Sequence, residues 1–234
     1  MKVYQTNEIK NISILGSSGS GKTTLAEAML YEGGVIKRRG SVENKNTVCD
    51  YFPVEKEYGY SVFSTVFCVE WQDRKLNFID CPGSDDFIGG AVSALNVTDT
   101  ALMVLNAQYG VEVGTINQFR YTEQFHKPVI FVVNQLDHEK ADYENAVAQL
   151  KDRWGSKVVQ IQYPVTCGPS FNAVVDVLKM KMYRWKPEGG VPDVLEIPAE
   201  ESEKAMDLHR ELVEAAAEHD DALMEKFFEE GTLS

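Results

Sequence analysis

Short runs of apolar residues alternate along the chain with stretches in which apolar residues recur at helical spacing. The predicted buried strands are residues 11–15, 76–79, 101–105 and 129–133, and the predicted helices are residues 25–31, 115–125 and 143–154. This alternation is typical of βαβ units around a mostly parallel sheet, which binds ligands at the carboxyl ends of its strands. Residues 61–71 alternate more loosely, which predicts an antiparallel strand at the edge of that sheet.

The pattern changes after Trp154. The predicted elements of this part are strands at residues 157–165 and 173–185, a Gly- and Pro-rich loop at 186–198, and amphipathic helices at 200–217 and 221–230, the last with Asp220 as its N-cap. We therefore divide the chain near Gly155 into a first region of α/β type, residues 1–155, and a second region of α+β type, residues 156–234.

The composition is close to that of an average soluble protein, with 44% hydrophobic and 25% charged residues. No apolar run approaches the ~18 residues that cross a bilayer. Residues 1–15 lack the basic start and long apolar centre of a secretory signal. The four cysteines are scattered, so neither a zinc site nor a disulfide framework is indicated. We expect a cytoplasmic protein with no membrane contact.

The charge balance excludes one broad class of function. With 36 acidic against 23 basic residues, the net charge is −13, whereas a protein that coats nucleic acid by charge is expected to be basic. No direct sequence-specific contact with nucleic acid is therefore predicted. Contact with a ribonucleoprotein would use local patches or protein partners.

A glycine-rich segment lies between the first predicted strand and the first predicted helix. It fits G-x-x-x-x-G-K-[ST], whose backbone N–H groups surround phosphate oxygens at a helix N-terminus. The lysine would reach the β- and γ-phosphates, and the threonine after it would ligate Mg²⁺. The alternative, an ordinary Gly/Ser turn, is disfavoured by the strand and helix on either side. The predicted nucleotide-binding residues here are Gly16, Ser17, Ser18, Gly19, Ser20, Gly21, Lys22, Thr23 and Thr24.

A second segment, Asp80-Cys-Pro-Gly83, ends the predicted strand at residues 76–79. The Asp80 carboxylate would hold Mg²⁺ through water, and the Gly83 N–H, after Pro82, would meet the γ-phosphate. Taken alone, this segment is also a good turn sequence, because proline presets φ. Beside the glycine-rich segment it predicts a nucleotide site.

A third segment, Asn134-Gln-Leu-Asp137, follows the predicted strand at residues 129–133. It is similar to N-K-x-D, in which the carboxylate binds two N–H donors of guanine. Adenine offers no such pair, so Asp137 would select GTP over ATP. The alternative is that Asp137 only caps a helix that begins near His138. The predicted base-binding residues are Asn134, Gln135 and Asp137.

With these motifs in order, the chain resembles the GTP-binding domain of elongation factor G, a translational GTPase. Further similar segments are residues 110–115 (GVEVGT), 161–165 (IQYPV), 171–176 (FNAVVD) and 218–225 (EHDDALME). The resemblance implies an α/β P-loop GTPase, with a mostly parallel sheet flanked by helices, in residues 1–155, and an α+β insertion in residues 156–234. In that family a last guanine-binding loop, a strand and a helix follow the insertion. We therefore expect a chain ending at Ser234 to be truncated.

The resemblance also implies GTP or GDP and Mg²⁺ as ligands, with the metal held by Thr23, Ser61 and Asp80, and the ribosome as partner of the parent protein. This chain departs from the family at four places. Ser84 replaces the His that orients the attacking water, Tyr58 the Arg of R-G-I-T, Gly19 a P-loop Asp, and Gln135 the Lys of N-K-x-D. Since phosphoryl transfer relies on positioning, we expect weak or absent GTP hydrolysis unless another group orients the water.

Three functions stay open on the sequence. The insertion favours a translocation factor like elongation factor G. The altered switch residues keep open a ribosome protection or rescue GTPase of the tetracycline-resistance type. A non-hydrolysing GTP-binding module is the third, favoured by Ser84, Tyr58 and Gly19. The oligomeric state does not follow from the sequence.

Overall fold

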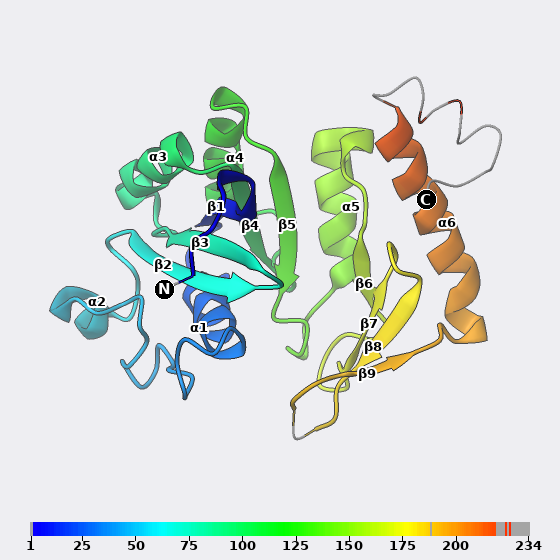
Figure 1. The fold of residues 1–234 in the computed structure, drawn as a ribbon, viewed down its shortest axis with the longest axis horizontal. Helices are drawn as coiled ribbons and strands as arrows, with labels where there is room; N and C mark the ends of the chain where they lie inside the picture. The colour runs from blue at the N-terminus through cyan, green and yellow to red at the C-terminus, as the bar shows by residue number, and fades with distance from the viewer. Residues whose placement is uncertain (1, 188, 219–222, 224, 226–234) are drawn as a thin grey trace. The chain divides into compact units, whose positions relative to one another are not determined.

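The computed structural model describes residues 2–187, 189–218, 223 and 225. The chain forms two compact units, Met1–Gln135 and Leu136–Ser234, which Figure 1 shows. The domain boundary expected near Gly155 stays a prediction. The predicted helix at residues 221–230 and its N-cap Asp220 lie outside the described residues.

The first unit is built on a five-stranded sheet with the strand order β2-β3-β1-β4-β5. These strands are β1 (Ile9–Leu15), β2 (Thr65–Trp71), β3 (Arg74–Asp80), β4 (Thr100–Asn106) and β5 (Val129–Asn134). All are parallel to their neighbours except β2, which pairs antiparallel with β3 at the edge. The predicted mostly parallel sheet and its antiparallel edge strand are therefore confirmed.

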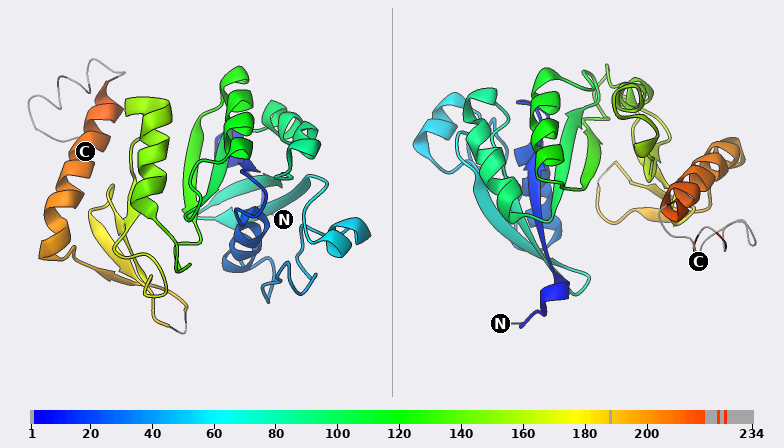
Figure 2. Two further views of the ribbon diagram at one scale, coloured as in Figure 1. Left: turned by 180° about the vertical axis from the view of Figure 1, so that it is seen from behind. Right: turned by 90° about the horizontal axis from the view of Figure 1, so that it is seen from above.

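Helices cover both faces of this sheet (Figures 1 and 2). The helices are α1 (Lys22–Glu32) on one face, α3 (Ile88–Val97) and α4 (Val113–Gln124) on the other, and α2 (Pro53–Tyr58) in the connection from α1 to β2. Two 3-10 helices, Thr6–Glu8 and Asp85–Phe87, precede β1 and α3. The sequence predicts α1 and α4 but not α3, whose second and third residues are glycines of low helix propensity.

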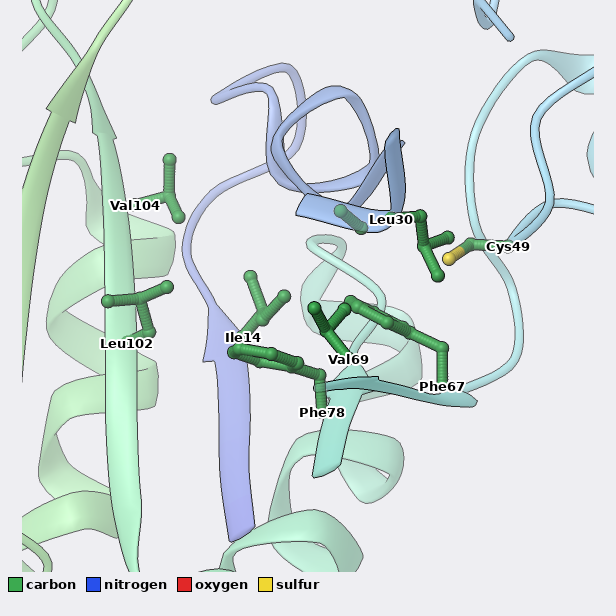
Figure 3. Close-up of a cluster of buried hydrophobic side chains, with 9 residues drawn as sticks. Ile14, Leu30, Cys49, Phe67, Val69, Phe78, Leu102 and Val104 are labelled. Atoms are coloured by element: carbon green, nitrogen blue, oxygen red, sulfur yellow. The ribbon is translucent and has the colours of Figure 1, made fainter. Parts of the chain in front are cut away.

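A buried hydrophobic cluster fills the space between α1 and the sheet (Figure 3). Leu30 of α1 packs there with Ile14, Phe78 and Val104, which come from three parallel strands. The rings of Phe67 and Phe78 stack with centroids 5.1 Å apart. This packing fixes the strands whose carboxyl ends carry the predicted binding motifs.

The second unit contains a four-stranded sheet with the order β6-β7-β8-β9 and antiparallel pairing throughout. Its elements are α5 (Tyr143–Trp154), the 3-10 helix Gly155–Lys157, β6 (Gln162–Pro164), β7 (Ala173–Asp176), β8 (Lys181–Arg184), β9 (Asp193–Leu195) and α6 (Ala199–Ala217). Ion pairs of 2.7 Å between Lys151 and Glu211 and 2.6 Å between Lys204 and Glu144 join α5 to α6.

Three expectations for this unit were wrong. The single strand predicted at residues 173–185 is two strands, because the Asp176 carboxylate accepts from the Lys179 N–H at 2.9 Å and Met180 takes a φ of 50°, which makes a turn. The predicted loop at 186–198 contains β9, and the strand predicted at 157–165 is reduced to β6.

In the part of the chain that the structure describes, no helix combines the length and apolar character needed to span a bilayer.

Candidate functional site

The loop that the sequence predicts to bind phosphate, residues 16–21, connects β1 to α1 at the carboxyl end of the sheet, and we call it the phosphate-binding loop. Gly16 has a φ of 135°, and a Cβ there would lie 2.2 Å from the Val104 carbonyl oxygen, so a larger residue does not fit. Gly21 caps α1 with a φ of 90°. The first N–H groups of α1 have no partner inside the helix, and they point out of its N-terminus toward the loop.

Lys22 is the cation of this site, and only 6% of its surface is exposed. Its ammonium donates to the carbonyl oxygens of Gly16 and Ser17, each at 2.9 Å. Burial lowers the pKa of Lys22, while the charge of Asp80 opposes that shift. An ammonium has three N–H donors, so one donor remains for an anion bound by the loop.

The three predicted metal ligands come together. The Thr23 hydroxyl donates to Asp80 Oδ2 at 2.9 Å and lies 3.2 Å from Ser61 Oγ. The Ser61 hydroxyl donates to Asp50 Oδ1 at 2.7 Å, which adds a second carboxylate. Asp50 is 6% exposed, and the sequence did not point to it, because the stretch that carries it has neither strand nor helix periodicity.

The second oxygen of Asp80 is the least satisfied group of this cluster. Oδ1 is buried without a hydrogen-bond partner among the described residues, and Asp80 as a whole is 1% exposed. Burial raises its pKa to about 7, against the charge of Lys22 and the hydrogen bond from Thr23. Mg²⁺ prefers oxygen ligands such as carboxylates, and a cation would satisfy this buried oxygen. The residues present therefore fit Mg²⁺.

The segment after Asp80 borders the phosphate-binding loop. A Cβ on Gly83 would lie 2.4 Å from Lys22 Nζ and 2.7 Å from the Ser18 nitrogen, so the Gly83 backbone lies against both. Pro82 is buried beside it. Ser84 follows, half-buried, as N-cap of the 3-10 helix Asp85–Phe87, and its hydroxyl makes no capping hydrogen bond.

The third motif is divided between the two units. Asn134 Nδ2 donates to the Ser20 carbonyl oxygen and Gln135 Nε2 to that of Gly19, each at 2.9 Å. Both residues thus hold the phosphate-binding loop. Asp137 is exposed in the second unit, and its contact with a base stays a prediction.

The remaining predicted residues of the loop differ in exposure. Ser17 and Ser20 are buried, whereas Ser18, Gly19 and Thr24 are exposed. Ser20 Oγ has no hydrogen-bond partner among the described residues. Solvent therefore reaches the loop at Ser18 and Gly19.

A family model described as "Elongation factor Tu GTP binding domain" matches residues 7–225. The chain belongs to this family of GTP-binding domains. The match covers both units, and it agrees with the order of the three motifs at the carboxyl ends of β1, β3 and β5.

Two relatives are similar to this GTP-binding domain over nearly its whole length. An elongation factor G-like protein of Thermotoga maritima is 34% identical over 221 residues, which are 94% of this chain and 31% of that protein. A crystal structure of a Thermus thermophilus protein superposes with a TM-score of 0.88 at 34% identity, over 94% of this chain and 33% of that one. The predicted resemblance to elongation factor G is confirmed, and the chain spans about a third of the length of these relatives.

Two side-chain contacts with the phosphate-binding loop were not predicted from the sequence. Gln118 of α4 binds Gly16, with its Oε1 2.6 Å from the Gly16 nitrogen. Thr115 places its hydroxyl 3.2 Å from that of Ser17. Both residues lie in the predicted helix at 115–125 and are fully buried. Polar residues on the sheet-facing side of that helix are the feature of the sequence that could have predicted these contacts.

Proposed function

We propose that this chain binds GTP and GDP with Mg²⁺ as the GTP-binding domain of a ribosomal translocation factor like elongation factor G. One observation carries the proposal: the buried, unpartnered Asp80 oxygen lies in a cluster of hydroxyls and carboxylates at the start of α1. Nucleotide phosphates would give the Lys22 ammonium a negatively charged partner. A divalent cation would give the Asp80 carboxylate a positively charged partner. The family of elongation factor GTP-binding domains supports guanine as the base.

Each group has a role in this proposal. The backbone N–H groups of residues 16–21 and the free donor of Lys22 bind the β- and γ-phosphates. Thr23, Ser61 and Asp80 hold Mg²⁺, which neutralises charge on the phosphate oxygens when bound. The Gly83 N–H meets the γ-phosphate, and Asp137 accepts from guanine.

Hydrolysis is the step that we expect to be weak or absent. The half-buried Ser84 stands where the family has a water-orienting His, and its hydroxyl is too short to replace an imidazole. A non-hydrolysing GTP-binding module is therefore the second candidate. Ribosome protection or rescue is a third, which the altered switch residues keep open. For all three candidate functions the proposed partner is the ribosome, and the proposed location is the cytoplasm.

The test measures binding first and hydrolysis second. GTP and GDP should bind in a Mg²⁺-dependent way, and ATP should bind far more weakly. Phosphate release from GTP is then measured with and without ribosomes, for the unsubstituted protein (the parent) and for its Ser84→His variant. Release by the variant alone assigns the defect to Ser84, whereas release by the parent refutes the hydrolysis-deficient interpretation. Equal affinity for ATP and GTP would refute the guanine assignment.

A further inference from the structure

Two side-chain amides tie the phosphate-binding loop to the end of β4. Gln135 Nε2 donates to the Gly19 carbonyl oxygen at 2.9 Å, and Asn106 Nδ2 donates to Gln135 Oε1 at 2.8 Å. Asn106 is the last residue of β4 and is 7% exposed. We call these two residues the amide pair.

A backbone group sets the direction of every hydrogen bond in the amide pair. The Gln108 N–H donates to Asn106 Oδ1 at 2.8 Å. Because a backbone N–H can only donate, Asn106 must turn its oxygen toward Gln108 and its NH₂ toward Gln135. Gln135 must then turn its oxygen to Asn106 and its NH₂ to Gly19. Donor and acceptor chemistry therefore fixes the orientation of both side-chain amides.

The carbonyl that the amide pair binds lies in a segment with two glycines of positive φ. Gly19 and Gly21 have positive φ values of 78° and 90°, and glycine readily rotates between such conformations. A Cβ at Gly19 would meet nothing within 4 Å, so side-chain packing does not restrain this position. Hydrogen bonds to the carbonyls of Gly19 and Ser20, from Gln135 and Asn134, restrain it instead.

We propose that Asn106 and Gln135 act together as positioning residues that fix the Gly19 peptide, and with it the N–H groups of the phosphate-binding loop. The inference rests on the proposed function, in which those N–H groups bind a guanine nucleotide. A lysine at position 135, as in N-K-x-D, could donate to Gly19 but has no acceptor for Asn106. Gln135 and Asn106 are therefore matched to each other.

The matching predicts a specific pattern of loss and recovery. Asn106→Asp removes the donor to Gln135 Oε1, so Gln135 loses its fixed orientation, and affinity for GTP and GDP should fall about tenfold, as for one lost hydrogen bond of a constrained site. The affinity of the Gln135→Lys single variant for GTP and GDP should fall by a similar factor. Combining the two should restore affinity to within about threefold of the parent, because the new ammonium can donate to both the new carboxylate and the Gly19 carbonyl.

Control variants separate positioning from charge and from folding. Asn96→Asp adds the same charge at an exposed position on α3, and its affinity should equal that of the parent. Urea unfolding is measured for every variant. If Asn106→Asp does not fold, Gln135→Met at a half-buried position removes the donor to Gly19 with little change in volume. Amide hydrogen exchange of residues 17–21 without nucleotide gives a second readout, and it should be faster in each single variant.

The outcomes are distinguishable. Weakened single variants with a recovered double variant support the matched pair. Single variants that bind as the parent does, or a double variant weaker than either, overturn it while leaving the proposed function intact. A parent that binds no guanine nucleotide overturns the proposed function and this inference with it.

Discussion

The Gln118 side chain binds both backbone polar groups of Gly16. Its Oε1 accepts from the Gly16 N–H at 2.6 Å, and its Nε2 donates to the Gly16 carbonyl oxygen at 3.3 Å. The same carbonyl accepts from the Lys22 ammonium at 2.9 Å. The helix α4 therefore takes part in placing Lys22, although it is remote from the loop in sequence.

Gln118→Leu tests this relationship. The substitution leaves the buried Gly16 N–H without its acceptor, which should lower the free energy of unfolding by about 1–3 kcal/mol. It should also weaken nucleotide binding, because Gly16 no longer holds Lys22 in place. Urea unfolding and nucleotide titration measure the two effects. Gln124→Leu, exposed on the same helix, should change stability by less than about 0.5 kcal/mol. Equal effects of the two substitutions would contradict the prediction.

The pKa of Asp80 predicts how stability varies with pH. Burial raises that pKa to about 7 in the folded chain, whereas an unfolded Asp has a pKa of about 3.9. Between these values the folded state keeps a proton that the unfolded state has lost, so stability falls as pH rises through this window. Asp50 shifts in the same direction, also through burial. Without nucleotide and Mg²⁺, unfolding should therefore be easier at about pH 8 than at about pH 5.

Mg²⁺ should reverse this dependence, since the proposed site binds it through the ionised carboxylate. Its stabilising effect should grow between about pH 5 and pH 8, which thermal unfolding with and without the metal would measure. Asp80→Asn is the control, because it removes one of the two titrating carboxyls and should reduce the slope of both curves in that window. A parent and an Asn variant with the same pH profile would falsify the assignment to Asp80.

The hydrogen bond between Ser61 and Asp50 predicts a coupled effect. Ser61→Ala removes a proposed metal ligand, and Asp50→Ala removes the 2.7 Å acceptor that orients it. Each should weaken Mg²⁺-dependent GTP binding by about 1 kcal/mol or more, and the double variant should be no weaker than Ser61→Ala alone. A double-mutant cycle of GTP affinities at saturating and limiting Mg²⁺ measures the coupling. Additive losses would mean that Asp50 acts independently of Ser61.

The sequence predicts those parts of the fold in which local pattern and tertiary environment agree. The apolar run that became β4 is continuous because this central strand, with a parallel neighbour on each side, is buried along nearly its whole length. The turn after Asp176 was missed, since it depends on one side-chain hydrogen bond and on a methionine with positive φ. Neither feature has a glycine or proline to mark it.

The site divides along similar lines. Lys22, Thr23 and Asp80 belong to motifs of fixed spacing, so they could be predicted in sequence and were found together. Gln118 and Asp50 reach the site from distant segments that carry no motif, and a lone Gln or Asp in a sequence is most often a solvated surface residue. The amide pair needed the three-dimensional contact between the ends of β4 and β5, which no single stretch of sequence contains.

Asp137 provides the sharpest test of base recognition. Its carboxylate is proposed to accept from two guanine N–H groups, and hydrogen bonds to a charged group contribute about 1.5–3 kcal/mol. Asp137→Asn replaces one acceptor oxygen by a donor, so GTP affinity should fall by about tenfold to a hundredfold. Xanthine carries a carbonyl oxygen where guanine carries its amino group, so the same variant should bind xanthosine triphosphate better than the parent does. Asp152→Asn, exposed on α5, changes the same charge and should alter neither affinity. A variant that loses affinity for both nucleotides alike would place Asp137 outside the base contact and leave it as part of the connection to α5.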